Sequence, residues 1–351
     1  MVKTVTITSG KGGVGKTNIS TNLSLYLSSL GYRTCLFDAD LGLANINIVL
    51  GLYPENTIED VIQGEMPLSS VIIKDFHGID IIPGSSGVEG LANIEPHKID
   101  NLIKSFLILD QYDFLFFDTS AGISKNVISF CLASSEILLV ITPEPTSLTD
   151  AYALLKILTL NGLQCPVKIV INQCMNAKIA KQTYAKFSEV VKRNLSVDLQ
   201  PLGMIITDQN VSGAVKDQQP FISLFPDTVA SRCIMKMGDN FLKNSNNEHE
   251  GYSIESFWKQ CIHLFKSNLN LDGKNKSITT PSPAGTDTVT KHSPPLRSKE
   301  NPPRIEKATY GFIQLDETFY SHITKLIESI DTVSHEVREL KEVIKKKNNE
   351  P

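Results

Sequence analysis

The sequence predicts an α/β protein built on a doubly wound, mainly parallel β-sheet. Three observations predict it: short apolar runs alternate with helical patterns as far as Leu242, the runs are rich in β-branched and aromatic residues, and Gly, Pro or Asp flank them. Such strands are buried on both faces, as in a parallel sheet covered by helices on each side. The expected strands are residues 5–8, 34–37, 79–82, 114–117, 137–141, 167–171 and 202–206.

A glycine-rich segment follows the first expected strand. Residues 9–17 read Ser-Gly-Lys-Gly-Gly-Val-Gly-Lys-Thr, which contains the pattern Gly-x-x-x-x-Gly-Lys-[Ser/Thr], and a helical pattern follows over residues 16–30. Backbone N–H groups of such a loop and the helix N-terminus surround phosphate oxygens. The segment predicts a bound nucleoside triphosphate, with Lys16 on the β- and γ-phosphates and the Thr17 hydroxyl on Mg²⁺. The expected nucleotide contacts in this segment are Gly10, Lys11, Gly12, Gly13, Val14, Gly15, Lys16, Thr17 and Asn18.

Two later strands end in acidic residues. Residues 114–118 read Phe-Leu-Phe-Phe-Asp, and Asp118 is expected to hold the Mg²⁺ shell opposite the loop. The second strand ends with Asp38 and Asp40, and two carboxylates at i and i+2 on extended backbone share a face. We expect Asp38 to support Mg²⁺ through water and Asp40 to orient the attacking water, because phosphoryl transfer depends mainly on positioning. Strand-end aspartates that cap the next turn or helix are the alternative interpretation.

Lys11 is a second lysine in the variable part of the loop, and there it resembles the deviant phosphate-loop class, the MinD/ParA family. Segments 9–17, 38–45 and 118–124, together with Asn172, match that family in order and spacing. The resemblance implies an ATP-dependent homodimer that hydrolyses ATP slowly and acts as a spatial or numerical switch. It also implies that Lys11 reaches the partner's nucleotide, as an arginine finger does, and works with Lys16 and Asp40.

Further segments resemble the flagellar-number branch of that family, the FlhG/FleN-type ATPases. They are Asn18, residues 45–52 followed by residues 57–61, the Pro-Gly-Ser-Ser-Gly run at 83–87, and residues 142–152, which read Thr-Pro-Glu-Pro-Thr-Ser-Leu-Thr-Asp-Ala-Tyr. The resemblance implies that Asn45 contacts a partner's phosphate and that Asn172 and Asp208 contact adenine. Residues 205–208 read Ile-Ile-Thr-Asp and lack the proline of the family's Ile-Pro-x-Asp.

The implied function is control of flagellar number or placement, with a flagellar GTPase or a transcriptional regulator as partner. Division-site placement of the MinD type and DNA partitioning of the ParA type are alternatives within the family. A phosphate-loop ligase, an Fe–S carrier ATPase and a non-catalytic coiled-coil scaffold are alternatives from other classes. Lys11 disfavours the ligase, and intact Lys16, Asp40 and Asp118 disfavour the scaffold.

Composition limits the partners and the compartment. The chain has 351 residues and a formal net charge of −4, which gives no general attraction to nucleic acid. Its six cysteines form no C-x-x-C pair, which favours a reducing cytosol and disfavours an Fe–S site. The β-rich pattern begins at Val2, so no signal peptide is expected, and no apolar run approaches the ~20 residues of a membrane-spanning helix.

The ATPase domain is expected over residues 1–243, followed by an amphipathic helix over residues 252–268. The only Trp of the chain lies on the apolar face of this helix, flanked by Lys259 and Lys266, a pattern typical of helices that lie in a membrane interface. It also resembles the C-terminal membrane-targeting helix of MinD and FlhG. We therefore expect a cytoplasmic protein held peripherally on the inner face of the plasma membrane. A terminal helix that packs its apolar stripe on the domain is the alternative.

Two further segments follow that helix. Residues 269–308 are rich in Pro, Ser, Thr and Lys, which predicts a disordered linker. Residues 309–348 are expected to form a coiled-coil helix, because apolar residues recur at heptad spacing between Phe319 and Ile344 with β-branched residues at the a positions. Parallel pairing of this helix would make the nucleotide-free protein a dimer. The alternative is a single helix that docks its apolar stripe on the ATPase domain.

Overall fold

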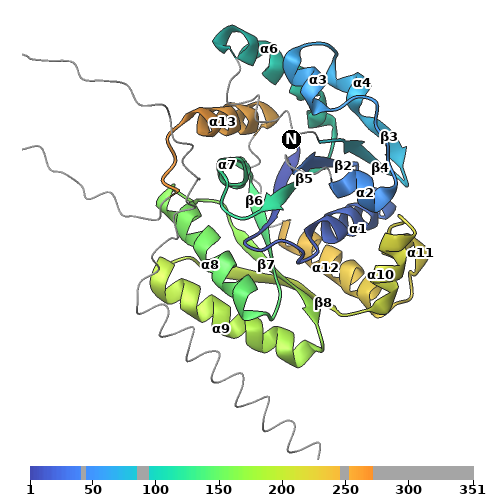
Figure 1. Ribbon diagram of the computed structural model, residues 1–351, viewed down its shortest axis with the longest axis vertical. Helices are drawn as coiled ribbons and strands as arrows, with labels where there is room; N and C mark the ends of the chain where they lie inside the picture. The colour runs from blue at the N-terminus through green and yellow to red at the C-terminus, as the bar shows by residue number, and fades with distance from the viewer. Residues whose placement is uncertain (41–44, 85–94, 246–252, 272–351) are drawn as a thin grey trace, which may run out of the picture.

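The computed structural model confirms the predicted fold class. An eight-stranded sheet in the order β3-β4-β2-β5-β1-β6-β7-β8 carries helices on both faces (Figure 1). The structure describes residues 1–40, 45–84, 95–245 and 253–271, so the predicted coiled coil and nearly all of the predicted linker lie outside the described residues. In chain order the strands are β1 (Lys3–Ser9), β2 (Thr34–Ala39), β3 (Ile73–Phe76), β4 (Ile79–Ile82), β5 (Phe114–Ala121), β6 (Glu136–Ile141), β7 (Val167–Cys174) and β8 (Leu199–Ile206).

One strand was missed in the sequence. β3 pairs antiparallel with β4, whereas the other pairs of neighbouring strands are parallel. The turn between β3 and β4 uses left-handed backbone at His77 and Gly78, with φ of 50° and 94°. β3 is an edge strand in which exposed Lys74 and Asp75 separate half-buried Ile73 and Phe76, so it lacks the apolar run that identified the other strands.

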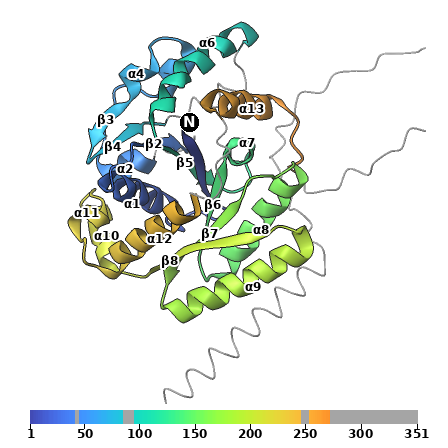
Figure 2. The same ribbon diagram turned by 180° about the vertical axis from the view of Figure 1, so that it is seen from behind.

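Two layers of helices cover the sheet, and Figures 1 and 2 show them from opposite sides. The helices of the first layer are α1 (Lys16–Ser29), α2 (Asn45–Leu50), α10 (Gln209–Lys216), α11 (Phe221–Leu224) and α12 (Val229–Ser245). The second layer contains α3 (Ile58–Gln63), α4 (Leu68–Val71), α6 (Pro96–Phe106), the 3₁₀ helix η2 (Leu107–Gln111), α7 (Lys125–Ala133), α8 (Pro145–Leu160), α9 (Ala177–Leu195) and α13 (Ile254–Lys266).

The central strands are buried on both faces, as the continuous apolar runs predict. Along β5, Phe116 joins the core under α1 and α12, while Phe117 joins the core under α7 and α13. The same alternation holds in β6, where the neighbouring residues Leu138 and Leu139 join cores on opposite faces of the sheet. Because these strands are also parallel, their carboxyl ends meet at one edge of the sheet.

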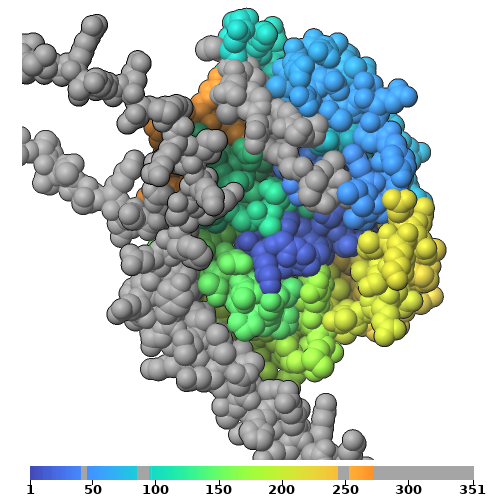
Figure 3. Space-filling view, viewed as in Figure 1, coloured from blue at the N-terminus to red at the C-terminus, as the bar shows by residue number. Residues whose placement is uncertain are grey.

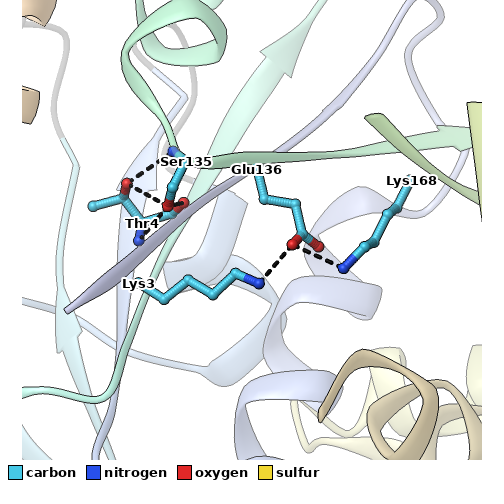
Figure 4. Close-up of polar contacts among 5 residues, drawn as sticks. All are labelled: Lys3, Thr4, Ser135, Glu136 and Lys168. Atoms are coloured by element: carbon cyan, nitrogen blue, oxygen red, sulfur yellow. Dashed lines mark hydrogen bonds and ion pairs between the residues drawn. The ribbon is translucent and has the colours of Figure 1, made fainter. Parts of the chain in front are cut away.

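A buried ionic cluster lies at the amino ends of β1, β6 and β7. Glu136 Oε2 lies 2.6 Å from Lys3 Nζ and 2.8 Å from Lys168 Nζ (Figure 4). Both ammonium groups also face the ring of Phe241 in α12, at 5.0 Å and 5.4 Å from its centroid. Removing one partner from a buried ion pair costs several kcal/mol, ~3–5 by mutation. These contacts therefore tie the three strands and α12 together at the base of the sheet.

The apolar face of α13 is buried in the domain, as the alternative interpretation of this helix expects. Trp258 is 0% exposed, and its ring stacks on Phe106 with centroids 3.9 Å apart. Phe257 stacks in the same way on Phe117 of β5, at 4.6 Å. In this structure the apolar stripe therefore does not face outward, because it has aromatic partners from α6 and β5 that the helical pattern alone does not reveal.

The docked helix makes a large contribution to burial. Its buried side chains are Ile254, Phe257, Trp258, Cys261, Ile262 and Phe265. Burying one large apolar side chain contributes about 1.5–3 kcal/mol, so this face as a whole holds α13 firmly. None of the helices in the described ranges has both the length and the apolar content needed to span a bilayer.

Candidate nucleotide-binding site

The glycine loop joins β1 to α1 at the carboxyl edge of the sheet, where the dark-blue N-terminal residues reach the surface in Figure 3. Gly13 and Gly15 have φ of 76° and 91°, a left-handed backbone that residues with a Cβ rarely adopt. Gly10 is needed for space, since a Cβ there would lie 2.1 Å from the backbone carbon of Asp150 in α8. Gly13 and Gly15 therefore allow the loop to bend, and Gly10 allows it to pack closely against α8.

Lys16 is the first residue of α1 and is only 8% exposed. Its Nζ donates a hydrogen bond to Ser9 Oγ at 2.9 Å, so the amine lies inside the loop. Burial lowers the pKa of Lys16, and the nearby carboxylates of Asp118 and Asp40 oppose that change. The structure thus brings together the lysine and the acidic residues that the sequence singled out.

Asp38 and Asp118 lie side by side on paired strands, β2 and β5. Both carboxylate oxygens of Asp118 are buried without a hydrogen-bonding partner among the described residues. Burial raises the pKa of Asp118 to about 7, against the opposing effects of the Thr17 hydroxyl and the Lys16 amine. Burial and the charge of Asp118 likewise raise the pKa of Asp38, whose carboxylate accepts the backbone N–H groups of Asp40 and Ile46 at 3.1 Å and 3.3 Å.

A divalent cation fits this arrangement. Buried carboxylates without partners are unfavourable, and hard cations such as Mg²⁺ take oxygen ligands. In the described part of the chain no group of three or more His, Cys, Asp or Glu side chains could hold a metal by itself. Mg²⁺ characteristically uses one or two carboxylates together with substrate phosphates and water, which suits Asp118, Asp38 and Thr17.

Lys11 lies at the surface and is engaged within its own chain. Its Nζ lies 2.5 Å from Glu144 Oε1 and 2.8 Å from Thr146 Oγ1, at the start of α8. The hydrogen bond from Lys11 lowers the pKa of Glu144. The sequence showed both segments as family-like motifs, but not that they contact each other.

The expected adenine contacts have other partners in this structure. Asn172 Nδ2 donates to the carbonyl of Val14 at 2.8 Å. Asp208 caps α10 by accepting from Asn210 N at 3.0 Å, and it also accepts from Ala230 N in α12 at 3.2 Å. Although burial raises it, these hydrogen bonds hold the pKa of Asp208 below its usual value. The carboxylate of Asp208 therefore ties two helices together, which the missing proline of the motif did not indicate.

Three other residues complete the comparison with the sequence. Asn18 lies in the first turn of α1, and Asn45 is the first residue of α2. Gln173 was not anticipated, yet its Nε2 donates to the carbonyl of Gly13 in the phosphate loop at 3.2 Å. No spacing rule identifies Gln173, and the only signal for it was its place after the strand-end Asn172.

Comparisons with known proteins agree with this geometry. The ParA family model, described as NUBPL iron-transfer P-loop NTPase, matches residues 1–242. The antiactivator FleN of Pseudomonas aeruginosa is 42% identical over 66% of this chain and 82% of its own length. The flagellum site-determining protein YlxH of Helicobacter pylori is 35% identical over 74% of this chain and 90% of its own length.

A solved structure extends the comparison to the fold. The septum site-determining protein MinD from Pyrococcus horikoshii, complexed with Mg-ADP, aligns with a TM-score of 0.57 at 26% identity. The alignment covers 71% of this chain and 100% of the MinD chain. The carboxyl edge that holds the loop and the buried aspartates is the place where ligands bind in open α/β sheets.

We predict that the nucleotide-free protein loses stability as the pH rises toward neutrality. The pKa of Asp118 is raised from 3.8 to about 7 on folding. Between those values the folded state holds a proton that the unfolded state lacks, so the free energy of unfolding falls with rising pH, by at most ~4 kcal/mol, and levels off above about pH 7. Urea unfolding at several pH values from about 5 to 8 measures this slope.

The matched variant is Asp118→Asn, which cannot titrate at that position. Its free energy of unfolding should change less with pH than that of the wild type, while the raised pKa of Asp38 leaves some slope in both proteins. Identical pH slopes in the two proteins would show that Asp118 is ionised in the folded state.

Proposed function

Because the chain belongs to the MinD/ParA family of P-loop ATPases, we propose that it is an ATP-dependent dimerising switch that controls the number or placement of flagella. The observation that carries the proposal is the buried Asp118, which lies beside Asp38 and near Lys16 and whose carboxylate oxygens accept no hydrogen bond among the described residues. The phosphate loop next to it also contains Lys11. The flagellar process is supported by the names of two relatives, an antiactivator and a flagellum site-determining protein.

The reaction proposed is hydrolysis of ATP to ADP and phosphate. The oxygen of a water molecule attacks the γ-phosphorus, the bond to the β–γ bridging oxygen breaks, and the water's proton leaves to solvent or phosphate. Asp40 would orient that water, and Lys16 would hold the β- and γ-phosphates. Mg²⁺, held by Thr17 with Asp118 and Asp38, would neutralise charge on the phosphate oxygens.

Lys11 would act on the nucleotide of a second subunit. Its pair with Glu144 is solvent-exposed, with 34% and 54% of the two side chains accessible. Exposed ion pairs contribute only about 0–1 kcal/mol, so the lysine can exchange this contact for a more highly charged phosphate at little cost. The dimer would therefore form only when a triphosphate offers that charge. A flagellar GTPase or a transcriptional regulator would then bind the dimer, in keeping with the family resemblance.

Substitutions in the site separate binding from hydrolysis. We expect Lys16→Ala to lose the response to nucleotide, because the loop loses its main phosphate contact. We expect Asp40→Ala to bind MgATP and dimerise but to hydrolyse it at least tenfold more slowly, because the attacking water loses the carboxylate that orients it. Phosphate release and light scattering with MgATP and MgADP measure the two steps. Normal turnover in Asp40→Ala would remove its assigned role.

The process itself is tested in flagellated cells whose only copy of the gene carries a site variant. Lys16→Ala should change the number or position of flagella as deletion of the gene does, since the switch can no longer load ATP. Electron microscopy of single cells gives the counts, with the wild-type gene as the control. Normal flagella together with misplaced division septa would favour the division-site alternative instead.

We also propose that the ATP-bound dimer associates peripherally with the inner face of the plasma membrane through α13. The helix must first leave its site, which exposes its apolar face and the aromatic groove of Phe106 and Phe117. Such exposure is costly. Lipid can cover the apolar face of the helix, but it leaves the groove on the domain exposed, so a single helix binds the membrane weakly. Two helices in a dimer gain avidity.

Vesicle sedimentation tests that proposal with Trp258, the only tryptophan of the chain, as a probe. With phosphatidylglycerol vesicles and MgATP we expect binding and a change in Trp258 emission. MgADP, or MgATP without vesicles, should leave the buried emission unchanged because the helix stays docked. Equal sedimentation with ADP and ATP would refute the coupling of membrane binding to dimerisation.

A further inference from the structure

The carboxyl end of β7 is distorted at the point where it faces the phosphate loop. The pairing of β7 with β8 changes register between Ile171 and Cys174, which is the mark of a bulge. Within it, Gln173 has φ of 56°, a left-handed backbone that is uncommon for a residue other than glycine. Bulges often occur beside functional sites, where they redirect a side chain, and strained backbone persists only where its surroundings enforce it.

The bulge directs two neighbouring amides onto consecutive carbonyls of the loop. Asn172 Nδ2 donates to Val14 O at 2.8 Å, and Gln173 Nε2 donates to Gly13 O at 3.2 Å. The backbone N–H of Gln173 donates to Asn172 Oδ1 at 2.8 Å, which orients the side-chain amide of Asn172. Asn172 also fills the space beside Gly15, where a Cβ would lie 2.4 Å from Nδ2.

These contacts matter because of how a phosphate loop binds an anion. Its N–H groups must converge on the phosphate oxygens, so its carbonyl groups must point away from them. A carbonyl that turns inward would repel the phosphate, and a side-chain donor on the outer side holds a carbonyl in the outward orientation. Amide side chains at 172 and 173 supply donors for two successive carbonyls without adding a charge.

We propose that Gln173 is a positioning residue that keeps the phosphate loop open for nucleotide by holding the carbonyl of Gly13 outward. The side chain reaches that carbonyl from a left-handed backbone at the end of β7. The inference deepens the proposed function, since it rests on nucleotide binding at this loop. Gln173 acts through the loop and leaves the attacking water to Asp40, so it should affect nucleotide affinity and leave turnover of bound ATP unchanged.

The test compares Gln173→Ala with Gln173→Gly. Both remove the amide, but glycine adopts the left-handed backbone without strain. We expect both variants to weaken binding of MgATP and MgADP about fivefold, the loss typical of one hydrogen bond, with KM raised and kcat unchanged. Titration with a fluorescent ATP analogue and steady-state phosphate release give the two quantities. Met175→Ala, at a site 77% exposed and two residues further on, is the matched control and should bind as the wild type does.

Each remaining outcome decides against the inference. Wild-type nucleotide affinity in both Gln173 variants would overturn it. So would weakened affinity in Gln173→Ala together with wild-type affinity in Gln173→Gly, because backbone strain and not the lost amide would then be responsible. A lowered kcat at unchanged KM would place Gln173 in the chemical step. If the wild type itself bound no nucleotide, the proposed function would fail. That result differs from the outcomes above, in which the wild type binds nucleotide and only the role of Gln173 fails.

Discussion

Two carboxylates buried on adjacent strands are compatible with the folded state only if a proton or a cation accompanies them. The pairing of β2 with β5 places Asp38 beside Asp118, and burial raises the pKa of both. At the opposite end of the sheet the same problem is solved permanently, because Glu136 has Lys3 and Lys168 as partners. The carboxyl edge has no equivalent solution for Asp118 in the described chain, where neither of its oxygens has a hydrogen-bonding partner. Without a ligand, Asp118 is accommodated by a proton, as its raised pKa indicates, and a bound cation would replace that proton.

Much of the site could be predicted from the sequence, because its parts are local patterns. The loop at residues 10–17, the buried strand before Asp118 and the Asp38–Asp40 pair each follow from spacing and alternation. Their convergence also follows, since the carboxyl ends of parallel strands meet at one edge. What could not be predicted depends on contacts between distant segments: Lys11 with Glu144, Asp208 with α12, and Gln173 with the loop. A hydrogen bond between residues far apart in the chain leaves no periodicity to detect.

The helix α13 illustrates the same limit in the fold. An amphipathic stripe shows that something must cover the apolar face of a helix. The same stripe is expected whether lipid or protein covers it, so the sequence does not distinguish the two. Here Trp258 stacks on Phe106 and Phe257 on Phe117, so protein covers the face. The edge strand β3 was missed for the opposite reason, since in its four residues only the half-buried Ile73 and Phe76 are apolar, which is too short a run to identify a strand.

The strength of the Lys11 contact determines what kind of switch this site can be. A lysine buried in a strong pair would be unavailable to a second subunit, whereas one exposed on both sides of its pair is held weakly. Glu144 carries a single negative charge and is exposed to water. The terminal phosphate of ATP carries more negative charge and would lie between two subunits, where the dielectric constant is lower, so it would attract the lysine more strongly. The lysine would therefore move to the triphosphate once two subunits meet, and after hydrolysis and phosphate loss it would return to Glu144. In the proposed exchange, the weak resting contact would leave the direction of the movement to the nucleotide.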